Sequence, residues 1–293
     1  MKKILITGAN SYIGTSFAAY LAQPEFKNQY QVDTLDMIGD AWRSYDFSNY
    51  DTVYHVAGIA HSDSGAISEE RAKLYYAVNT DLTVACAKRA KEAGVKQFIF
   101  MSSVIVYGDS APIGKQNIIT RDTPVNPANC YGDSKVQAEN GIRPLDCDTF
   151  KVVILRPPMI FGKNSKGNYP LLSKLAQKLP VFPKVENCRS MLYIGNLVEF
   201  VRLMVENDER GTFWPQNPQY SNTSEVIAAI AKAHGKRCML IPGFGWALRI
   251  MAHATGLVNK AFGNLAYELS MSEYKQPYQK YSLQEAIIIT EQK

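Results

Sequence analysis

The first two dozen residues constrain the fold of this chain more than any other stretch. An apolar run at 3–7 leads directly into a short segment that begins with Gly8 and ends with Gly14, and a helical pattern follows at 12–23. A strand that turns at once into a helix needs glycine where a side chain would collide with the sheet or with a ligand. This segment therefore predicts the first strand, turn and helix of a parallel α/β fold.

The first half of the chain alternates between strand-like and helix-like segments. Short apolar runs are expected to be strands, and the longer amphipathic stretches between them are expected to be helices. The expected strands are 30–36, 52–57, 97–101 and 152–155, and the expected helices are 72–93, closed by Gly94, and 131–142. Strands that alternate with helices pair in parallel through right-handed crossovers. The pattern therefore predicts a Rossmann-type, doubly wound parallel sheet.

After Arg156 this alternation ends. Five prolines and two glycines between 157 and 183 predict mostly loops, with a helix at 171–179. Further helices are expected at 194–205 and 224–233. The expected organisation is a dinucleotide-binding domain and a smaller, interleaved C-terminal substrate lobe. The domain comprises 1–156 with 190–222 returning to it, and the lobe comprises 157–189 and 223–293.

The composition excludes several classes of protein. Hydrophobic residues make up 46% of the 293 residues and charged residues 20%, as is typical of a packed globular chain. The 32 basic and 27 acidic side chains give a net charge of +5 without a concentrated basic run, so we expect no nucleic-acid partner. No apolar stretch reaches the ~18–20 residues of a membrane span. The apolar segment 243–262 is expected to pack on the substrate lobe or at a dimer surface, not on a membrane.

Cysteine and histidine usage bears on compartment and metals. Five scattered cysteines are typical of reduced thiols in the cytoplasm rather than of a disulfide framework. The N-terminus lacks the long apolar core of a signal peptide, which also favours a cytoplasmic protein. The four histidines occur in no zinc-binding spacing, so we expect no metal site.

The glycine turn has the pattern of a dinucleotide site. Gly8 would make the turn, Gly14 would let helix and strand approach, and the helix N-terminus would offer backbone N–H groups to a pyrophosphate. The middle position is Ser11, which can donate a hydrogen bond to phosphate but weakens the glycine pattern. Asp36 ends the second strand, where a carboxylate would accept hydrogen bonds from ribose hydroxyls and repel a 2′-phosphate. This favours NAD; NADP stays possible because Arg43 lies nearby.

A tyrosine and a lysine share one face of a predicted helix. Tyr131 and Lys135 are four residues apart, so their side chains project in the same direction. An ammonium beside a phenol favours the phenolate and lowers the phenol pKa from ~10 toward neutrality. Such a phenol could take a proton from a hydroxyl group and return it, which is general acid–base catalysis.

Taken in order, these segments resemble the extended short-chain dehydrogenases/reductases, the NAD-dependent epimerase/dehydratase family. Residues 7–14 resemble the TGxxGxxG turn, 102–108 the SSxxVYG strand end, and 131–135 the YxxxK signature. The resemblance covers nearly the whole chain. It implies that Ser103, Tyr131 and Lys135 are catalytic, with Ser103 on the reacting oxygen and Lys135 also on the nicotinamide ribose.

The resemblance also implies further binding residues. Those for the cofactor are Gly8, Ser11, Tyr12, Ile13, Gly14, Asp36, Ala57, Gly58, Ile59, Asn79 and Lys135. Those for the substrate are Ser103, Asn168, Leu172, Phe182 and Arg189. Within this set, Asn79 would steady the central strands, Phe182 would fit a uracil pocket, and Arg189 would hold a diphosphate with its planar fork. The implied substrate is a UDP-sugar, and the implied assembly is a homodimer.

Departures from the family pattern narrow the activity. Val104 and Ile105 stand where sugar 4,6-dehydratases carry an Asp-Glu pair, and neither can move protons. Val104 also stands where 3,5-epimerase/4-reductases place a cysteine. The remaining chemistry is redox at C4 of the sugar. In addition, the segments 156–162, 167–176 and 189–194 resemble enzymes of bacterial capsule and O-antigen pathways.

Two activities stay open at this point. The favoured one is a UDP-sugar 4-epimerase that passes through a transient 4-keto sugar and leaves NAD unchanged overall. The alternative is an NAD(P)H-dependent reductase of a UDP-4-keto-6-deoxy-N-acetylhexosamine. A non-catalytic NAD(P)-sensing protein on the same fold is disfavoured, because both Tyr131 and Lys135 are kept.

Overall fold

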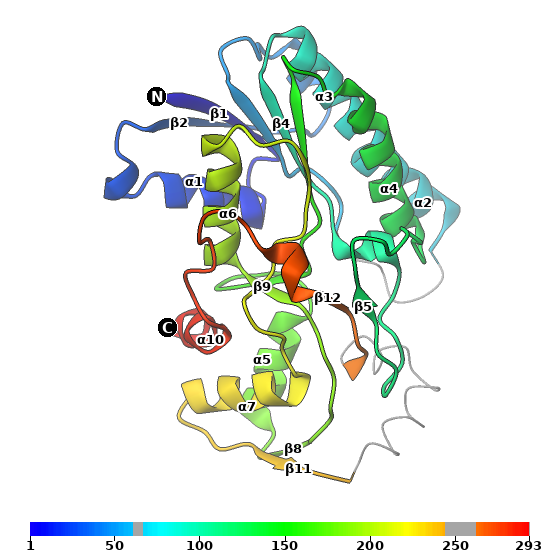
Figure 1. Ribbon diagram of the computed structural model, residues 1–293, viewed down its shortest axis with the longest axis vertical. Coiled ribbons are helices and arrows are strands. Elements are labelled where there is room, and N and C mark those ends of the chain that lie inside the picture. The colour runs from blue at the N-terminus through cyan, green and yellow to red at the C-terminus, as the bar shows by residue number, and fades with distance from the viewer. Residues whose placement is uncertain (61–66, 244–261, 293) are drawn as a thin grey trace. The chain divides into compact units, whose positions relative to one another are not determined.

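A six-stranded parallel sheet organises the first part of the chain. The computed structural model describes residues 1–60, 67–243 and 262–292. The strands follow the order β10-β6-β4-β3-β1-β2 (Figure 1). Their bounds are β1 Lys2–Thr7, β2 Tyr30–Leu35, β3 Thr52–His55, β4 Gln97–Met101, β6 Lys151–Leu155 and β10 Gly211–Phe213. The expected Rossmann-type parallel sheet is confirmed, and β10 is a strand that the sequence analysis did not predict.

Helices cover both faces of this sheet. On one face lie α2, α3 and α4, and on the other lie α1 and α6 (Figure 1). Their bounds are α1 Tyr12–Leu21, α2 Glu69–Tyr75, α3 Leu82–Glu92, α4 Cys130–Ile142 and α6 Ile194–Glu206. The expected helix at 72–93 is interrupted, because a π-helical segment at Tyr76–Asp81 joins α2 to α3. It ends as expected at Gly94, whose φ of 82° is a backbone conformation that favours glycine.

By its internal contacts the chain divides into two compact units. The first unit comprises Met1–Gly108, Val125–Pro157 and Val198–Phe213, and the second comprises Asp109–Pro124, Pro158–Leu197 and Trp214–Lys293. In this division the segment that returns to the first unit is shorter than the expected 190–222. In addition, a stretch before α4 belongs to the second unit. No local pattern marks that exchange of chain between the units.

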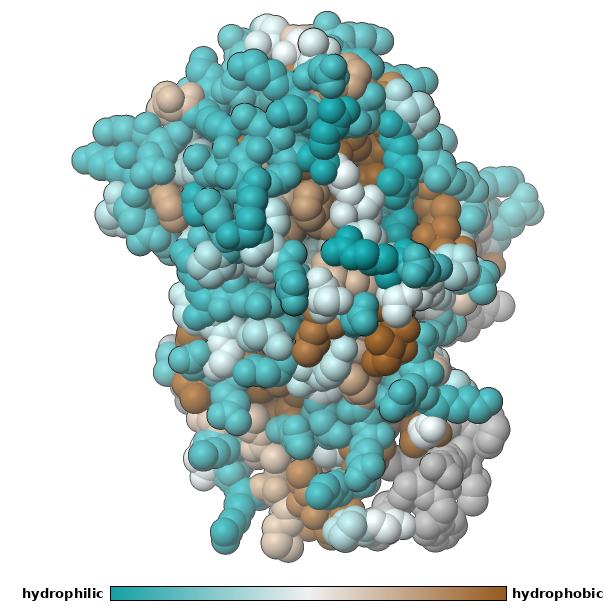
Figure 2. All heavy atoms as spheres, in the orientation of Figure 1, coloured by the Kyte–Doolittle hydropathy of each residue, from teal (hydrophilic) through white to brown (hydrophobic). Residues whose placement is uncertain are grey.

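The second unit is built from short elements. Its helices are α5 Tyr169–Lys178, α7 Thr223–Ala233 and α10 Leu283–Glu291, close to the positions expected for the first two. Its two-stranded parallel ladders pair β7 Met159–Phe161 with β9 Met191–Tyr193, β8 Val181–Pro183 with β11 Met239–Ile241, and β5 Ile118–Ile119 with β12 Ala266–Tyr267. Hydrophobic surface is visible where β8 and β11 pair (Figure 2). Most of the expected helix at 243–262 lies outside the described residues.

Two features of the described residues concern membranes and metals. Within residues 1–60, 67–243 and 262–292, no helix is long and apolar enough to cross a bilayer. The same residues contain no cluster of three or more His, Cys, Asp or Glu side chains that could hold a metal ion.

A buried histidine closes the end of β3. The His55 Nδ1 atom lies 2.7 Å from Thr7 Oγ1, and its Nε2 atom lies 3.0 Å from Thr83 Oγ1. The ring stacks on Phe98 at a centroid distance of 5.6 Å. Burial, followed by the nearby Lys135 charge, lowers the pKa of His55 to about 3. His55 is therefore a neutral core residue that links β1 to α3.

Replacing this histidine with a group that does not titrate should remove part of the acid sensitivity of the fold. In the unfolded chain His55 takes up a proton near pH 6.5, whereas the folded chain keeps it neutral to about pH 3, so stability is lost as pH falls through this window. Relative to His55→Gln, the wild-type free energy of unfolding should fall by about 2 kcal/mol between pH 7 and pH 5. Urea unfolding at each pH measures this difference, and a difference independent of pH would contradict the prediction.

Candidate functional site

The turn after β1 has room for backbone but not for side chains. Gly8 has a φ of 100°, and a Cβ atom there would lie 2.7 Å from the backbone nitrogen of Ala57. A Cβ atom on Gly14 would lie 2.7 Å from Ser11 Oγ and 3.0 Å from Ile6 Cγ2. Close approach of backbone therefore requires glycine at position 8, as the sequence pattern predicts, whereas Gly14 is closely surrounded by side chains. The Ser11 hydroxyl caps α1, because its oxygen accepts a hydrogen bond from the Gly14 N–H at 3.1 Å.

This turn fits a dinucleotide phosphate. Helix α1 begins at Tyr12, and Ile13 follows in its first turn. Backbone N–H groups in the first turn of a helix have no acceptor within the helix, so they can bind a phosphate. Asp36 follows β2 and is exposed, and its Oδ1 accepts a hydrogen bond from the Ile38 N–H at 2.9 Å. Arg43, a possible ligand for a 2′-phosphate, pairs with Asp40 at 2.9 Å. The expected preference for NAD is consistent with this exposed carboxylate.

An asparagine anchors the loop that follows β3. The side chain of Asn79 accepts a hydrogen bond from the Ile59 N–H at 2.8 Å and donates to the Ile59 carbonyl at 3.2 Å. Its amide also donates to Ser134 Oγ on α4 at 3.1 Å. Asn79 lies within the π-helical segment, so this irregular turn carries the residue that joins the loop to α4. A Cβ atom on Gly58 would lie 3.0 Å from Asn79 Oδ1 and 3.3 Å from Lys135 Nζ.

The three expected catalytic residues come together near the end of β4. Ser103 follows the strand and caps a 3₁₀ turn at Val104–Tyr107. Tyr131 lies in the first turn of α4, near enough to Ser103 for that hydroxyl to lower the pKa of the phenol. The Nζ atom of Lys135 donates to the Met101 carbonyl at 2.9 Å and lies 4.8 Å from the centroid of the Phe100 ring.

The pKa of the phenol differs from the sequence-based expectation. Burial raises the pKa of Tyr131 above its ordinary value, while the Ser103 hydroxyl lowers it and nearby Tyr75 raises it. Burial also lowers the pKa of Lys135 to about 8, and the charge of Glu139 opposes that shift. The expectation that the ammonium brings the phenol toward neutrality is wrong for this structure. The reason is that Lys135 is buried and Tyr131 is partly buried, and burial favours the neutral form of each.

The four substrate residues expected outside the Ser-Tyr-Lys group all lie in the second unit. Asn168 precedes α5, and Leu172 and Phe182 are buried in the hydrophobic core of that unit. Phe182 stacks on Phe262 with a centroid distance of 5.6 Å. Arg189 donates from Nη1 to the Gly263 carbonyl at 3.1 Å. Their role in substrate binding stays a prediction.

A buried ion pair beneath the site was not anticipated from the sequence. Glu139 lies on α4, one turn after Lys135, and it pairs with Arg156 just after β6. One signal was available, because Tyr131, Lys135 and Glu139 follow each other at intervals of four residues and so share one helix face. No local signal indicates that Arg156 is the partner.

The fold and the turn after β1 are those of a Rossmann-type α/β protein. The model of the NAD dependent epimerase/dehydratase family matches residues 4–214. The chain therefore belongs to that family, and the expected cofactor, NAD, is confirmed by the family assignment.

Two curated relatives are similar over much of the chain. The UDP-glucose 4-epimerase of Vibrio cholerae is 30% identical over an alignment that covers 92% of this chain and 88% of the relative. The N-acetyl-alpha-D-glucosaminyl-diphospho-ditrans,octacis-undecaprenol 4-epimerase of Escherichia coli O157:H7 is 32% identical over 71% of this chain and 64% of the relative.

Solved structures agree on the fold. The UDP-glucuronic acid 4-epimerase of Bacillus cereus, in complex with NAD, has a TM-score of 0.71 at 17% identity and covers 98% of this chain and 96% of its own. The UDP-glucose 4-epimerase of Thermus thermophilus, also with NAD, has a TM-score of 0.68 at 19% identity and covers 98% and 97%. At these identities the likeness concerns the fold alone.

Alanine substitutions at Gly8 and at Gly94 distinguish a steric clash of the Cβ atom from the strain of a positive φ alone. Gly8→Ala should cost more stability than Gly94→Ala, because both positions have positive φ but only Gly8 lacks room for a Cβ atom. We expect about 1–2 kcal/mol for Gly94→Ala and at least ~2 kcal/mol more for Gly8→Ala, measured by urea unfolding.

Binding of NAD gives a second measure for the same pair. Calorimetry should show at least ~10-fold weaker binding for Gly8→Ala and wild-type affinity for Gly94→Ala, which lies at the end of α3. Equal losses in the two variants would show that the turn has no special role.

Proposed function

We propose that this protein is an NAD-dependent 4-epimerase of UDP-hexoses or UDP-N-acetylhexosamines. The observation that carries the proposal is the grouping of Ser103 and Tyr131 with the buried Lys135 at the end of β4, where Lys135 donates to the Met101 carbonyl. Membership of the family and the 4-epimerase names of both curated relatives support the same reaction.

Each side chain has a distinct task in this proposal. Tyr131 takes the proton from the C4 hydroxyl as that carbon is oxidised, and returns it when the 4-keto sugar is reduced on its other face. Ser103 donates a hydrogen bond to the C4 oxygen and holds it beside the phenol. Lys135 supplies a positive charge that stabilises the phenolate while the proton is away. Bound NAD supplies the hydride acceptor and donor.

The cofactor would be held by the first unit. Gly8, Ser11 and Gly14 shape the turn for the pyrophosphate, and Asp36 receives the adenosine ribose hydroxyls. The loop of Ala57, Gly58 and Ile59, held by Asn79, lines the nicotinamide side. We assign recognition of the UDP group to residues of the second unit, namely Asn168, Leu172, Phe182 and Arg189. The expected homodimer is part of the same proposal.

A reductase of UDP-4-keto-6-deoxy-N-acetylhexosamines is the second candidate. The specific observation in its favour is the raised pKa of Tyr131, because a protonated phenol is the acid that reduction of a ketone requires. In an epimerase the same phenol must also act as a base. The two reactions therefore make different demands on one proton.

Turnover without added reductant separates the two candidates. Purified protein with UDP-glucose or UDP-N-acetylglucosamine, with NAD but no reductant, should yield the C4 epimer, observed by NMR. No epimer, together with oxidation of NADPH in the presence of a 4-keto-6-deoxy sugar nucleotide, would replace the epimerase with the reductase.

Removing the phenol oxygen should slow turnover by orders of magnitude and leave cofactor binding intact. We expect Tyr131→Phe to lower kcat by about 10²–10⁴-fold, because it loses the proton relay, with NAD affinity within about twofold of wild type. Tyr76→Phe is the matched control, since it removes a phenol that hydrogen-bonds Asp133 at 2.9 Å. This control should retain near wild-type kcat. If Tyr131→Phe kept full activity, or if the wild type bound NAD without any turnover, the catalytic assignment would fail.

A further inference from the structure

A buried carboxylate lies one helical turn after Lys135. Glu139 is 1% exposed and accepts four hydrogen bonds. Its Oε1 accepts from Ser102 Oγ at 2.6 Å and from Arg156 Nε at 3.0 Å. Its Oε2 accepts from Arg156 Nη2 at 2.5 Å and from Arg143 Nη2 at 2.9 Å. This two-point contact with a guanidinium fixes the geometry of both partners.

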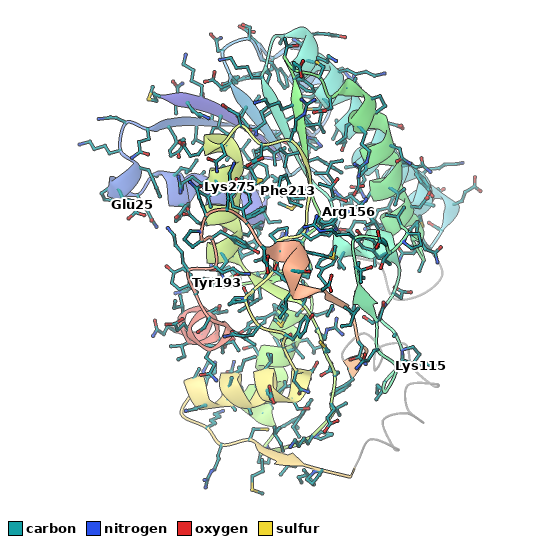
Figure 3. The ribbon with its side chains drawn as sticks, in the orientation of Figure 1. Glu25, Lys115, Arg156, Tyr193, Phe213 and Lys275 are labelled. Atoms are coloured by element: carbon teal, nitrogen blue, oxygen red, sulfur yellow. The ribbon has the colours of Figure 1, made fainter. Side chains whose placement is uncertain are left out.

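The same ion pair reaches both ends of the loop that carries Ser103. Ser102, which Glu139 binds, is the residue directly before Ser103. Tyr107, at the far end of the 3₁₀ turn, receives a hydrogen bond on its hydroxyl from Arg156 Nη1 at 2.6 Å. Figure 3 labels Arg156 just beyond the end of the central strands. A shift of the pair would therefore move the loop at two points.

The charge of Glu139 also acts on the site. Lys135 is 6% exposed, and the charged group with the largest favourable effect on its ammonium is Glu139. Burial opposes the ammonium and lowers the pKa of Lys135 to about 8. From β3, His55 is neutral at this depth. From α4, Tyr131 is a neutral phenol; Arg143, just after α4, and Arg156, just after β6, face the carboxylate.

Stability alone gives little reason for such a group. A buried ion pair costs several kcal/mol to desolvate, and well-packed hydrophobic residues often stabilise a fold as well or better. The chain nevertheless keeps a carboxylate, a guanidinium, a serine and a tyrosine together under the site.

We propose that Glu139 and Arg156 are positioning residues for proton transfer: the pair fixes the loop that carries Ser103, and the Glu139 charge keeps Lys135 protonated. This proposal rests on the function proposed above for Tyr131 and Lys135. Neither member of the pair is assigned any contact with the sugar or the cofactor.

Two variants that shift the local charge in opposite directions test the proposal. Glu139→Gln removes the negative charge, so Lys135 should lose its proton at a pH lower by about one unit. Arg143→Met removes a positive charge that faces Glu139, so the midpoint of the Lys135 titration should move to higher pH. The shift should be only a few tenths of a unit, because the Arg143 side chain is 43% exposed. NMR of protein labelled at lysine Cε measures the midpoint, with Lys135→Met providing the assignment.

Kinetics give the second readout. In Glu139→Gln, kcat should fall at least ~30-fold with KM for the UDP-sugar within about threefold, and the alkaline limb of the kcat profile should move to lower pH. Glu139→Asp keeps the negative charge on a shorter side chain. The alkaline limb of its kcat profile should therefore stay near that of the wild type, while kcat falls. If Glu139 had only a structural role, Glu139→Gln and Glu139→Asp would not differ in the position of the alkaline limb.

The chain offers a matched control on another helix. Glu199 on α6 is also buried, binds Arg202 through two hydrogen bonds at 2.7 and 3.0 Å, and accepts one from the Tyr20 hydroxyl at 2.8 Å. Glu199→Gln should lower stability and leave both the Lys135 midpoint and the alkaline limb unchanged.

The two proposals fail differently. A wild-type protein that turns over no UDP-sugar would overturn the proposed function, and the lysine midpoints would still test the positioning proposal. A Lys135 midpoint that stays at the wild-type pH in Glu139→Gln and in Arg143→Met overturns the positioning proposal, whatever the turnover. Because Arg143 is partly exposed, that variant keeps the test available if Glu139→Gln does not fold.

Discussion

An ammonium group buried beside the end of β4 is the constraint on which the rest of the first unit depends. Lys135 has almost no access to water, so it needs an acceptor, a polarisable neighbour and a nearby negative charge. The Met101 carbonyl, the Phe100 ring and Glu139 supply these in turn. Together they fix how α4 lies against the sheet, and therefore where Tyr131 is held.

Local sequence patterns were sufficient for the frame of the first unit. The turn at Gly8 and Gly14 was predictable because a strand that turns directly into a helix leaves a recognisable glycine spacing in the sequence, although the backbone that Gly8 approaches belongs to the distant Ala57. The strands β1, β3 and β4 were predictable because each is a short apolar run in the sequence. The grouping of Ser103 with Tyr131 was predictable from a family resemblance and not from spacing.

Features that depend on distant parts of the chain were not predictable in this way. The strand β10 pairs with β6 across more than fifty residues, and the partner of Glu139 comes from another element. The pKa of Tyr131 was assigned the wrong direction because spacing reveals which groups are close but not how deeply they are buried. The roles of Asn168, Leu172, Phe182 and Arg189 remain predictions, since they rest on short loop motifs.

The π-helical turn between α2 and α3 is less favourable for the backbone than an α-helix, but it positions the side chain of Asn79. Deleting one residue from Tyr76–Asp81 would give a continuous α-helix with better backbone geometry, which folding alone would reward. A π-helical turn holds one more residue than an α-helical turn over nearly the same rotation, so α2 and α3 would keep their orientations and only the residues within the segment would shift. Asn79 could not then face both Ile59 and Ser134. The π-helical turn is less regular than an α-helix, but it lets Asn79 hold the loop at Ile59 against α4 at Ser134.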